Sequence, residues 1–298
     1  MLPEFHGVTR AERGKADCKA RCFFWEAGKS FPRGADDAYY VNMVDLHCHI
    51  LPGIDDGAQT IEDSLAMAED AIRDGITCVV ATPHASTEYH FDYEKVRAAR
   101  DELQGRLDGR LTIATGCDFH LNPENFLALK KDSAPFCINQ KDYLLVEFNE
   151  FSIPPAMDQT LHELHLMGLR PVITHPERNG ILRAQPERLL GWVRLGCYAQ
   201  VTAGSLSGVF GPGAQEDAWT WIDQGMVHFV SSDGHNTARR PVKLRFAYDA
   251  IAKDRGTKLA EALLVDNPNA AFNGAPLPYV PEVAPNVERR KKRRFFFF

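Results

Sequence analysis

Residues 43–75, MVDLHCHILPGIDDGAQTIEDSLAMAEDAIRDG, contain the signals that decide the fold. Residues 44–47 have the pattern of a short strand, and a loop of Pro, Gly and Asp residues follows. Thr60 and Asp63 have the spacing of a capping box, which marks the start of a helix. Gly75 stands where a helix commonly ends, because glycine adopts a left-handed backbone without strain. The stretch therefore predicts one strand followed by one helix.

The same alternation of strand and helix continues almost to the end of the chain. Further strands are predicted near 76–81, 111–115, 143–147, 171–174, 198–202 and 227–231. Helices are predicted near 93–107, 124–131, 156–167, 187–195 and 214–224, and two more follow Pro241 and Thr257 and end at Asn267 and Pro268. About seven such units predict an α/β fold with parallel strands, and a closed or nearly closed (β/α) barrel fits them better than an open sheet.

The composition is that of a globular chain, with 44% hydrophobic and 25% charged residues among 298. A formal charge of -6 gives no electrostatic attraction to a phosphate backbone, so we expect no nucleic-acid partner. The seven cysteines do not form an even disulfide framework, and we expect a cytoplasmic location. Cys18 and Cys22 lack a second ligand pair at zinc-finger spacing, so we expect no metal there. No run is apolar enough for a membrane span or a signal peptide.

Both ends of the chain differ in character from its middle. Residues 1–42 show no strand or helix period and are expected to be an extension outside the fold, with Met43 as an alternative translation start. Residues 43–274 are expected to form the barrel. Residues 275–298 are Pro-rich and then basic and aromatic, and we expect them to form no packed element. The basic run is interpreted as a solvated tail or, alternatively, as a weak contact with an anionic membrane surface.

Polar side chains gather where the predicted strands end. His47 and His49 are two positions apart on the first strand, so their imidazoles point to one side while Cys48 points to the other. The later strand ends carry His84, Asp118, His120, Glu147, His175, Asp233 and His235. Each of these alone has an ordinary explanation as a hydrogen-bonded edge residue. Barrel enzymes, however, place their active sites at the C-terminal ends of the strands, and so many polar ends together predict an active site there.

The residue types at these ends predict a metal centre. Histidine and carboxylate ligands without thiolate are typical of manganese, iron or zinc hydrolytic sites. Their number exceeds what one ion can use, which favours two or three ions with Glu147 as a bridging carboxylate. Asp56, in the following Asp-Asp-Gly turn, is a further candidate ligand, although such turns are common in loops. The six positive charges of three dications would exceed the negative charge of four carboxylates, so the site would attract a phosphate dianion. Arg178 is placed to bind the oxygens of that dianion.

Five motifs carry a resemblance to a known family. They are HCHILPGIDDG at 47–57, Ala81-Thr82-Pro83-His84, Leu145-Val146-Glu147-Phe148, Thr174-His175-Pro176-Glu177-Arg178 and Ser232-Asp233-Gly234-His235-Asn236. In type and order they resemble the bacterial protein tyrosine phosphatases of the CpsB/CapC type, which belong to the PHP (polymerase and histidinol phosphatase) superfamily. The resemblance covers about residues 43–273. It implies a distorted (β/α)7 barrel of the PHP type with a manganese-preferring centre of three ions.

The resemblance also implies roles for individual residues. Carried over by position, the metal ligands would be His47, His49, Asp56, His84, Asp118, Glu147, His175, Asp233 and His235, and Arg178 would hold the phosphate. The expected substrate is a phosphotyrosine protein, in that family typically a bacterial tyrosine kinase that controls capsule or exopolysaccharide export, through its C-terminal tail. Two positions depart from the pattern. Asp118 replaces the usual Glu, so its ion is expected to sit differently or more weakly, and Gly234 replaces Ala, which we expect to be harmless.

Spacing excludes the cysteine-dependent tyrosine phosphatases. Those enzymes carry an arginine six residues after the nucleophile, whereas Cys48 and Cys117 are followed at that spacing by Ile and Pro. We therefore expect a metal-activated hydroxide to attack phosphorus while Arg178 stabilises the added charge. His235, or a water bound by His49, would protonate the leaving group.

Two alternatives remain open. One is a PHP-superfamily phosphoesterase that acts on a small molecule such as histidinol phosphate or a nucleotide. The other is a non-catalytic barrel that docks a kinase tail and holds structural metals. The catalytic candidates in the leading interpretation are Asp56, Arg178 and His235, and His120 is left as a residue near the substrate mouth.

Overall fold

The structure, a computed structural model, describes residues 41–285. The predictions made for residues 1–40 and 286–298 lie outside this range, among them the Cys18 and Cys22 pair and the basic run. Within residues 41–285, no helix is both long enough and apolar enough to cross a membrane. The cysteines in the same range are free thiols.

Two parallel sheets form the centre of the described part. The strands are β1 (Met43–Cys48), β2 (Ile76–Ala81), β3 (His84–Ala85), β4 (Thr112–Thr115), β5 (Asp118–His120), β6 (Tyr143–Glu147), β7 (Arg170–Thr174), β8 (Tyr198–Thr202) and β9 (Phe229–Ser231). One sheet has the order β1-β2-β4, and the other has the order β3-β5-β6-β7-β8-β9. Every pairing is parallel, as the alternation of strands and helices predicts.

The nine strands of the two sheets occupy seven successive positions, because two of the positions each hold two short strands. Strand β3 continues from β2, and β5 continues from β4, with breaks at Pro83, which has no N–H to donate, and at Gly116. Between the first strand, β1, and the segment after the last strand, β9, a parallel bridge joins Cys48 to Gly234. The His49 N–H also donates to the Gly234 carbonyl at 2.8 Å. The order therefore agrees with the distorted (β/α)7 barrel that was expected.

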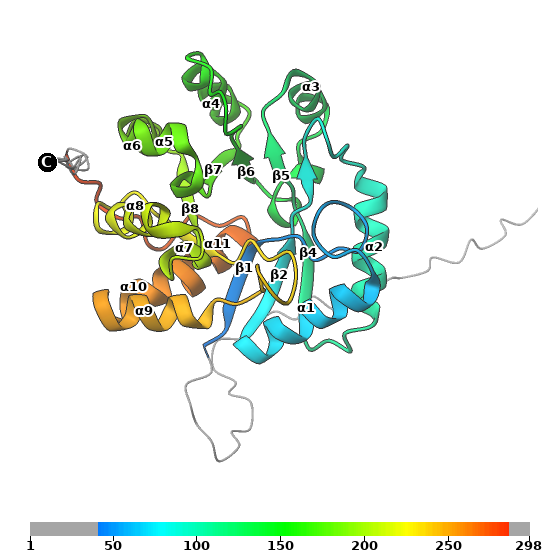
Figure 1. Ribbon diagram of the computed structural model, residues 1–298. Helices are drawn as coiled ribbons and strands as arrows, with labels where there is room; N and C mark the ends of the chain where they lie inside the picture. The colour runs from blue at the N-terminus through cyan, green and yellow to red at the C-terminus, as the bar shows by residue number, and fades with distance from the viewer. Residues whose placement is uncertain (1–40, 286–298) are drawn as a thin grey trace, which may run out of the picture. The chain divides into compact units, whose positions relative to one another are not determined.

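Helices connect the strands and lie outside them (Figure 1). The α-helices are α1 (Ile61–Asp74), α2 (Tyr93–Gly105), α3 (Pro123–Lys131), α4 (Met157–Leu166), α5 (Gly180–Ala184), α6 (Pro186–Arg194), α7 (Ala203–Leu206), α8 (Gly211–Asp223), α9 (Arg245–Arg255), α10 (Thr257–Glu261) and α11 (Asn267–Phe272). Shorter turns are η1 (Ala134–Phe136), η2 (Ile138–Gln140), η3 (Pro176–Arg178) and the π-helical η4 (Ala262–Asp266). Helix α1 begins at the predicted capping box of Thr60 and Asp63 and ends at Gly75, whose φ is 89°.

The prediction that the last helix ends at Asn267 and Pro268 is wrong. The chain passes from α10 through η4 into α11 and stays helical to Phe272. Pro268 lies directly after the π-helical η4, where the regular series of helical hydrogen bonds is already interrupted, so its missing N–H is accommodated. The Asn267 side chain is buried and donates to the backbone carbonyls of His228 and Tyr279.

Residues 275–285 contain no helix or strand, but they pack against the fold. Leu277 is buried, and the Tyr279 N–H donates to Asn267 Oδ1 at 3.0 Å. The Ala284 N–H donates to the carbonyl of Gln224 at 2.9 Å. The expectation that the Pro-rich segment forms no packed element is therefore wrong for residues 275–285, which pack against the fold without forming a helix or strand.

A buried apolar cluster ties the strands together. It contains Val44, Val80, Ala114, Leu145, Val172 and Phe229, one from each of six strands, with Ala271 of α11 and Leu277 beside them. Each large side chain buried in this way stabilises the fold by about 1.5–3 kcal/mol. A second cluster fills the space between strands and helices, for example at Ala68 of α1 and Val96 of α2. The strand ends that carry the polar residues are thus held by a rigid core.

Candidate metal centre

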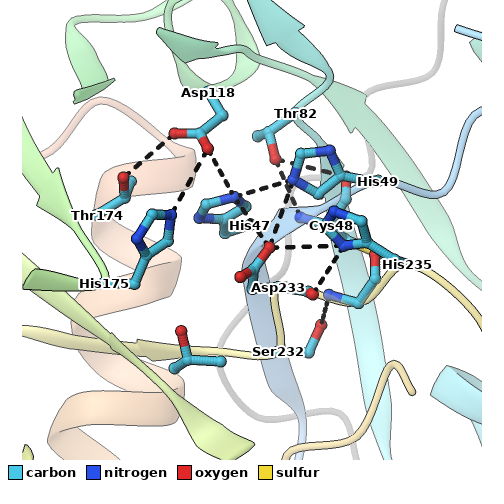
Figure 2. Close-up of polar contacts among 12 residues, drawn as sticks. His47, Cys48, His49, Thr82, Asp118, Thr174, His175, Ser232, Asp233 and His235 are labelled. Carbon is cyan, nitrogen blue, oxygen red and sulfur yellow. Dashed lines mark hydrogen bonds and ion pairs between the residues drawn. The ribbon is translucent and has the colours of Figure 1, made fainter. Parts of the chain in front are cut away.

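The structure brings all nine predicted ligands together, and His120 lies with them. The β1 end and the loop before α1 supply His47, His49 and Asp56; β3 and β5 supply His84, Asp118 and His120; the ends of β6 and β7 supply Glu147 and His175; and the segment after β9 supplies Asp233 and His235. Figure 2 shows His47, His49, Asp118, His175, Asp233 and His235 pointing toward one another. Their convergence follows from the parallel strands, which end at one side of the fold.

One half of the centre is built around His47. Its Nε2 lies 3.2 Å from His49 Nε2, 3.4 Å from Asp118 Oδ2 and 3.5 Å from Asp233 Oδ1. His175 completes this half, with its Nε2 3.8 Å from Asp118 Oδ2. All five side chains are buried.

The other half is built around His84. Its Nδ1 lies 3.2 Å from Glu147 Oε2, and its Nε2 lies 3.5 Å from Asp56 Oδ1. His235 Nε2 approaches the same Asp56 oxygen at 3.4 Å, and His120 Nε2 is in direct contact with Glu147. Asp56 is exposed, so this half opens toward solvent.

Two carboxylates connect the halves. Asp118 Oδ2 lies 3.5 Å from His84 Nδ1 as well as close to His47, and Glu147 Oε1 lies 3.5 Å from His175 Nε2 as well as close to His84. A carboxylate between two sets of histidines is placed to share its oxygens between neighbouring ions. The geometry is compatible with the bridging role expected of Glu147 and adds Asp118 as a second shared carboxylate.

Two residues that the sequence analysis did not identify orient the β1 histidines. Asp55 Oδ2 lies 2.7 Å from His49 Nδ1, and Gln200 Oε1 lies 3.0 Å from His47 Nδ1. Each partner accepts the Nδ1 proton and leaves Nε2 free to face the centre, the usual arrangement behind a metal-binding histidine. Gln200 could have been noticed as a polar residue within the apolar strand β8, whereas Asp55 and its neighbour Asp56 were indistinguishable by type.

Several buried atoms in the centre have no hydrogen-bond partner among the described residues. They are His84 Nδ1, Asp118 Oδ2 and His235 Nε2. Buried polar atoms are nearly always satisfied, and leaving one unsatisfied costs about 1–3 kcal/mol. Nitrogen and carboxylate oxygen atoms that face one another without hydrogen bonds are the donor set of a manganese, iron or zinc ion. The residues present therefore fit the metals that the sequence predicted.

The charges of the centre compensate one another. Burial alone would lower the pKa of His47, but the Asp118 and Asp233 carboxylates outweigh it and raise that pKa to about 9. Burial likewise opposes the charged form of His84, while Glu147 and Asp118 raise its pKa to about 10. The same pairings hold the pKa values of Asp118 and Asp233 well below their usual range despite burial. The carboxylates are thus ionised, and cations that bind them must displace protons from the imidazoles.

The backbone is strained where it presents two of the candidate ligands. His175 has a φ of 31° and Asp233 a φ of 52°, a region that non-glycine residues rarely adopt. Gly57 is required for a different reason, because a Cβ there would lie 2.0 Å from the His49 carbonyl oxygen. The loop after β1 can therefore bring Asp55 and Asp56 against His49 only with glycine at position 57.

Arg178 lies beside the centre, and a second arginine accompanies it. Arg178 Nη1 contacts Asp233, and its guanidinium lies 4.4 Å from the centroid of the Phe210 ring. Arg240 Nη2 lies 2.6 Å from the same Asp233 carboxylate oxygen. Arg178 lies in one of the sequence motifs, whereas Arg240 lies in the loop between β9 and α9 and belongs to none of them. Two guanidinium groups at one edge of the centre create a binding place for an anion.

The segment that carries His235 is tightly packed. His235 is buried, and burial lowers its pKa to about 4, so its imidazole is neutral at pH 7. A Cβ at the neighbouring Gly234 would lie 2.7 Å from Val242 Cγ2 and 3.0 Å from Ser232 Oγ. Glycine fits at position 234 without this contact, whereas alanine would require Val242 to move.

Comparison with known proteins agrees with the geometry of the site. Residues 43–273 match the family described as capsular polysaccharide synthesis, CpsB/CapC. The tyrosine-protein phosphatase YwqE of Bacillus subtilis is 36% identical over 265 residues, covering 85% of this chain and 100% of YwqE. The tyrosine-protein phosphatase CpsB of Streptococcus pneumoniae is 31% identical over 236 residues, covering 76% of this chain and 96% of CpsB.

Solved structures show the same relationship. A chain from the crystal structures of YwqE from Bacillus subtilis and CpsB from Streptococcus pneumoniae, described as unique metal-dependent tyrosine phosphatases, is 34% identical with a TM-score of 0.76. The match covers 82% of this chain and 100% of that chain. A β-aspartyl dipeptidase from Fervidobacterium islandicum is 15% identical with a TM-score of 0.52, covering 78% of this chain and 74% of that one, which is a likeness of fold alone.

Proposed function

The chain belongs to the CpsB/CapC family of capsular polysaccharide synthesis proteins, and from this membership we propose that it is a metal-dependent protein tyrosine phosphatase. The single observation that carries the proposal is the convergence of nine nitrogen and carboxylate donors with two arginines beside them. A hydrolytic centre and an anion-binding edge are the two parts that phosphate ester hydrolysis requires.

We propose manganese as the metal, with iron and zinc as alternatives, and two or three ions per chain. His47, His49, Asp56, His84, Asp118, Glu147, His175, Asp233 and His235 would hold them. When bound, such ions supply a water of lowered pKa and Lewis-acid stabilisation of the phosphoryl oxygens. The two shared carboxylates and the unsatisfied buried donors support this assignment.

The two arginines would hold the phosphate group. Both guanidinium groups share the Asp233 carboxylate, and Phe210 supports Arg178 from one side. A phosphate dianion offers them more acceptor oxygens than this one carboxylate does, so they are placed to bind it through paired hydrogen bonds. Their fixed positions would also favour the more highly charged transition state.

Protonation of the leaving group is less important for a tyrosine phosphate than for an alkyl phosphate. The phenol of tyrosine has a pKa near 10, so its phenolate departs more readily than an alkoxide. His235 was a candidate acid, but a pKa lowered to about 4 by burial makes it neutral, which suits a metal ligand better than a proton donor. Asp56, exposed beside His235, would act as a ligand at the open side.

The substrate we propose is a phosphotyrosine protein, with the C-terminal tail of a bacterial tyrosine kinase as the preferred candidate. The names of the relatives support a tyrosine phosphatase linked to capsule synthesis. A cytoplasmic location would bring the enzyme to such a kinase, and the free thiols of residues 41–285 suit a reducing compartment.

The test compares substrates on one preparation. Chelator-treated protein is assayed with and without added manganese on a phosphotyrosine peptide, a phosphoserine peptide and histidinol phosphate. We expect manganese-dependent release that is selective for phosphotyrosine. Release mainly from histidinol phosphate would instead assign the chain to the small-molecule phosphoesterases, and manganese binding without release from any substrate would support a docking role.

The arginine assignment has its own variant. Arg178→Ala is expected to lower kcat/KM for the phosphotyrosine peptide by about 100-fold or more, because a charged hydrogen-bond donor to the reacting group is lost. Arg97→Ala is the matched control, since Arg97 pairs with Glu94 on the exposed surface of α2. Unchanged turnover in Arg178→Ala would remove Arg178 from the site.

A further inference from the structure

A pocket opens beside the metal centre, between the loops that follow β3, β5 and β6. His120 and Glu147 form its inner wall, and both belong to the cluster of candidate ligands. These loops lead into α2, α3 and α4. The pocket is therefore a continuation of the centre and not a separate cavity.

The walls of the pocket are partly apolar. Leu121 and Phe148 directly follow His120 and Glu147 in the sequence. Phe148 and Met157, at the start of α4, are buried, and Leu121 is half-buried. Pro154 adds a further apolar surface, while Ser152 is an exposed residue at the rim. Apolar walls beside a site for charged phosphate indicate that the substrate also has an apolar part.

The size of the pocket fits one aromatic ring. Its volume is about 140 Å³, and an apolar protein cavity of about 150 Å³ accommodates benzene. In an aryl phosphate only the bridging oxygen separates phosphorus from the ring, so the ring must lie next to the groups that hold the phosphoryl group. Among the described residues, this pocket shares its wall with the candidate ligands and also has apolar sides.

We propose that this pocket binds the phenyl ring of the phosphotyrosine and so selects aryl over alkyl phosphate esters. The inference rests on the proposed phosphatase function and names the residues that give it selectivity: Leu121, Phe148, Pro154 and Met157 as the ring contacts, with Ser152 at the rim. Burial of the ring contributes to substrate and transition state alike, and a serine phosphate has no group to fill the same space.

The test fills the pocket from its rim. Ser152→Phe places a ring at an exposed position, so the fold tolerates it, and Ala156→Phe is the matched control on an exposed neighbour that does not line the pocket. We expect Ser152→Phe to lower kcat/KM for phenyl phosphate at least tenfold, while propyl phosphate changes less than twofold. The control should leave both substrates within twofold of the wild-type chain.

A second variant enlarges the pocket. Met157→Ala is expected to raise the ratio of kcat/KM for 1-naphthyl phosphate over phenyl phosphate at least threefold. If alkyl turnover is too slow to measure, inhibition constants of phenylphosphonate and propylphosphonate give the same comparison for each variant.

The outcomes separate the two proposals. Wild-type protein that hydrolyses no aryl phosphate with metal added would overturn the proposed function. Wild-type protein that hydrolyses phenyl phosphate, with Ser152→Phe affecting aryl and alkyl compounds equally or neither, would leave the function standing and overturn the ring pocket. An unchanged naphthyl ratio in Met157→Ala would also count against the ring contacts.

Discussion

At the scale of single residues, the centre depends on side chains that never touch the proposed metals. Asp55 accepts from His49 Nδ1 and also from the backbone N–H groups of Gly57 and His84. It therefore fixes an imidazole tautomer and two loops at once. Gln200 fixes His47 in the same way from the neighbouring strand.

Asp55→Asn should weaken manganese binding about 10- to 100-fold, because both Asp55 carboxylate oxygens accept hydrogen bonds and asparagine would replace one of them with an N–H₂ group. The measurement is a titration of the chelator-treated chain with manganese. Asp70→Asn, on α1 beside Arg73, is the control that changes charge equally. Equal affinities for the two variants would show that Asp55 does not orient the ligand.

Gly234→Ala should destabilise the fold by about 1–3 kcal/mol, since the new Cβ would meet the rigid side chain of Val242 at 2.7 Å. Urea unfolding measures the change. Adding Val242→Ala should cost less in the Gly234→Ala background than in the wild-type chain, because it relieves the clash. Strictly additive costs would contradict the contact.

At the scale of elements, the sequence predicted what local chemistry determines. The capping box at Thr60 and the helix stop at Gly75 each depend only on residues nearby in the sequence, and the structure has both. The break at Pro83 has a local cause, the missing N–H of proline, whereas the break at Gly116 and the π-helical link before α11 depend on tertiary packing, which no local pattern encodes. The convergence of the ligand candidates was predictable because parallel strands end on one side, whereas Arg240 came from a loop without a pattern.

His228, the residue before β9, hydrogen-bonds to β8 and gives a pH-dependent stability. Its Nδ1 accepts from the Ala199 N–H at the start of β8, and burial lowers its pKa to about 4. The unfolded chain binds the proton below about pH 6.5 while the folded chain does not, so this contribution is full above that pH and is lost as the pH falls toward 4. The wild-type free energy of unfolding should fall by about 2 kcal/mol more than that of His228→Gln between pH 7 and pH 5. Parallel curves for the two proteins would disprove the assignment.

At the scale of the whole molecule, residues 275–285, which follow α11, pack against the core and are part of the fold. The carbonyl of Ala275 accepts from Tyr143 Oη at 2.8 Å and from Arg170 Nη1 at 3.0 Å. Leu277 is buried in the cluster that joins six strands. The Pro-rich composition of this segment predicted its lack of helix and strand but gave no sign of these contacts.

A chain that stops after Gly274 should lose at least about 3 kcal/mol of stability, because it loses the Leu277 side chain and the hydrogen bonds of Ala275 and Tyr279. Thermal unfolding compares it with a chain that stops after Pro285, which retains every described contact. Equal melting temperatures would show that residues 275–285 contribute nothing to the core.

The central claim is that the strand ends form a catalytic centre of two or three metal ions. The most direct measurement is the manganese content per chain together with the turnover of a phosphotyrosine peptide by the same sample, followed as a chelator removes the metal and manganese restores it. Two or three ions per chain, with turnover that disappears and returns in step with them, is the predicted result. Turnover that survives complete removal of metal would contradict the account.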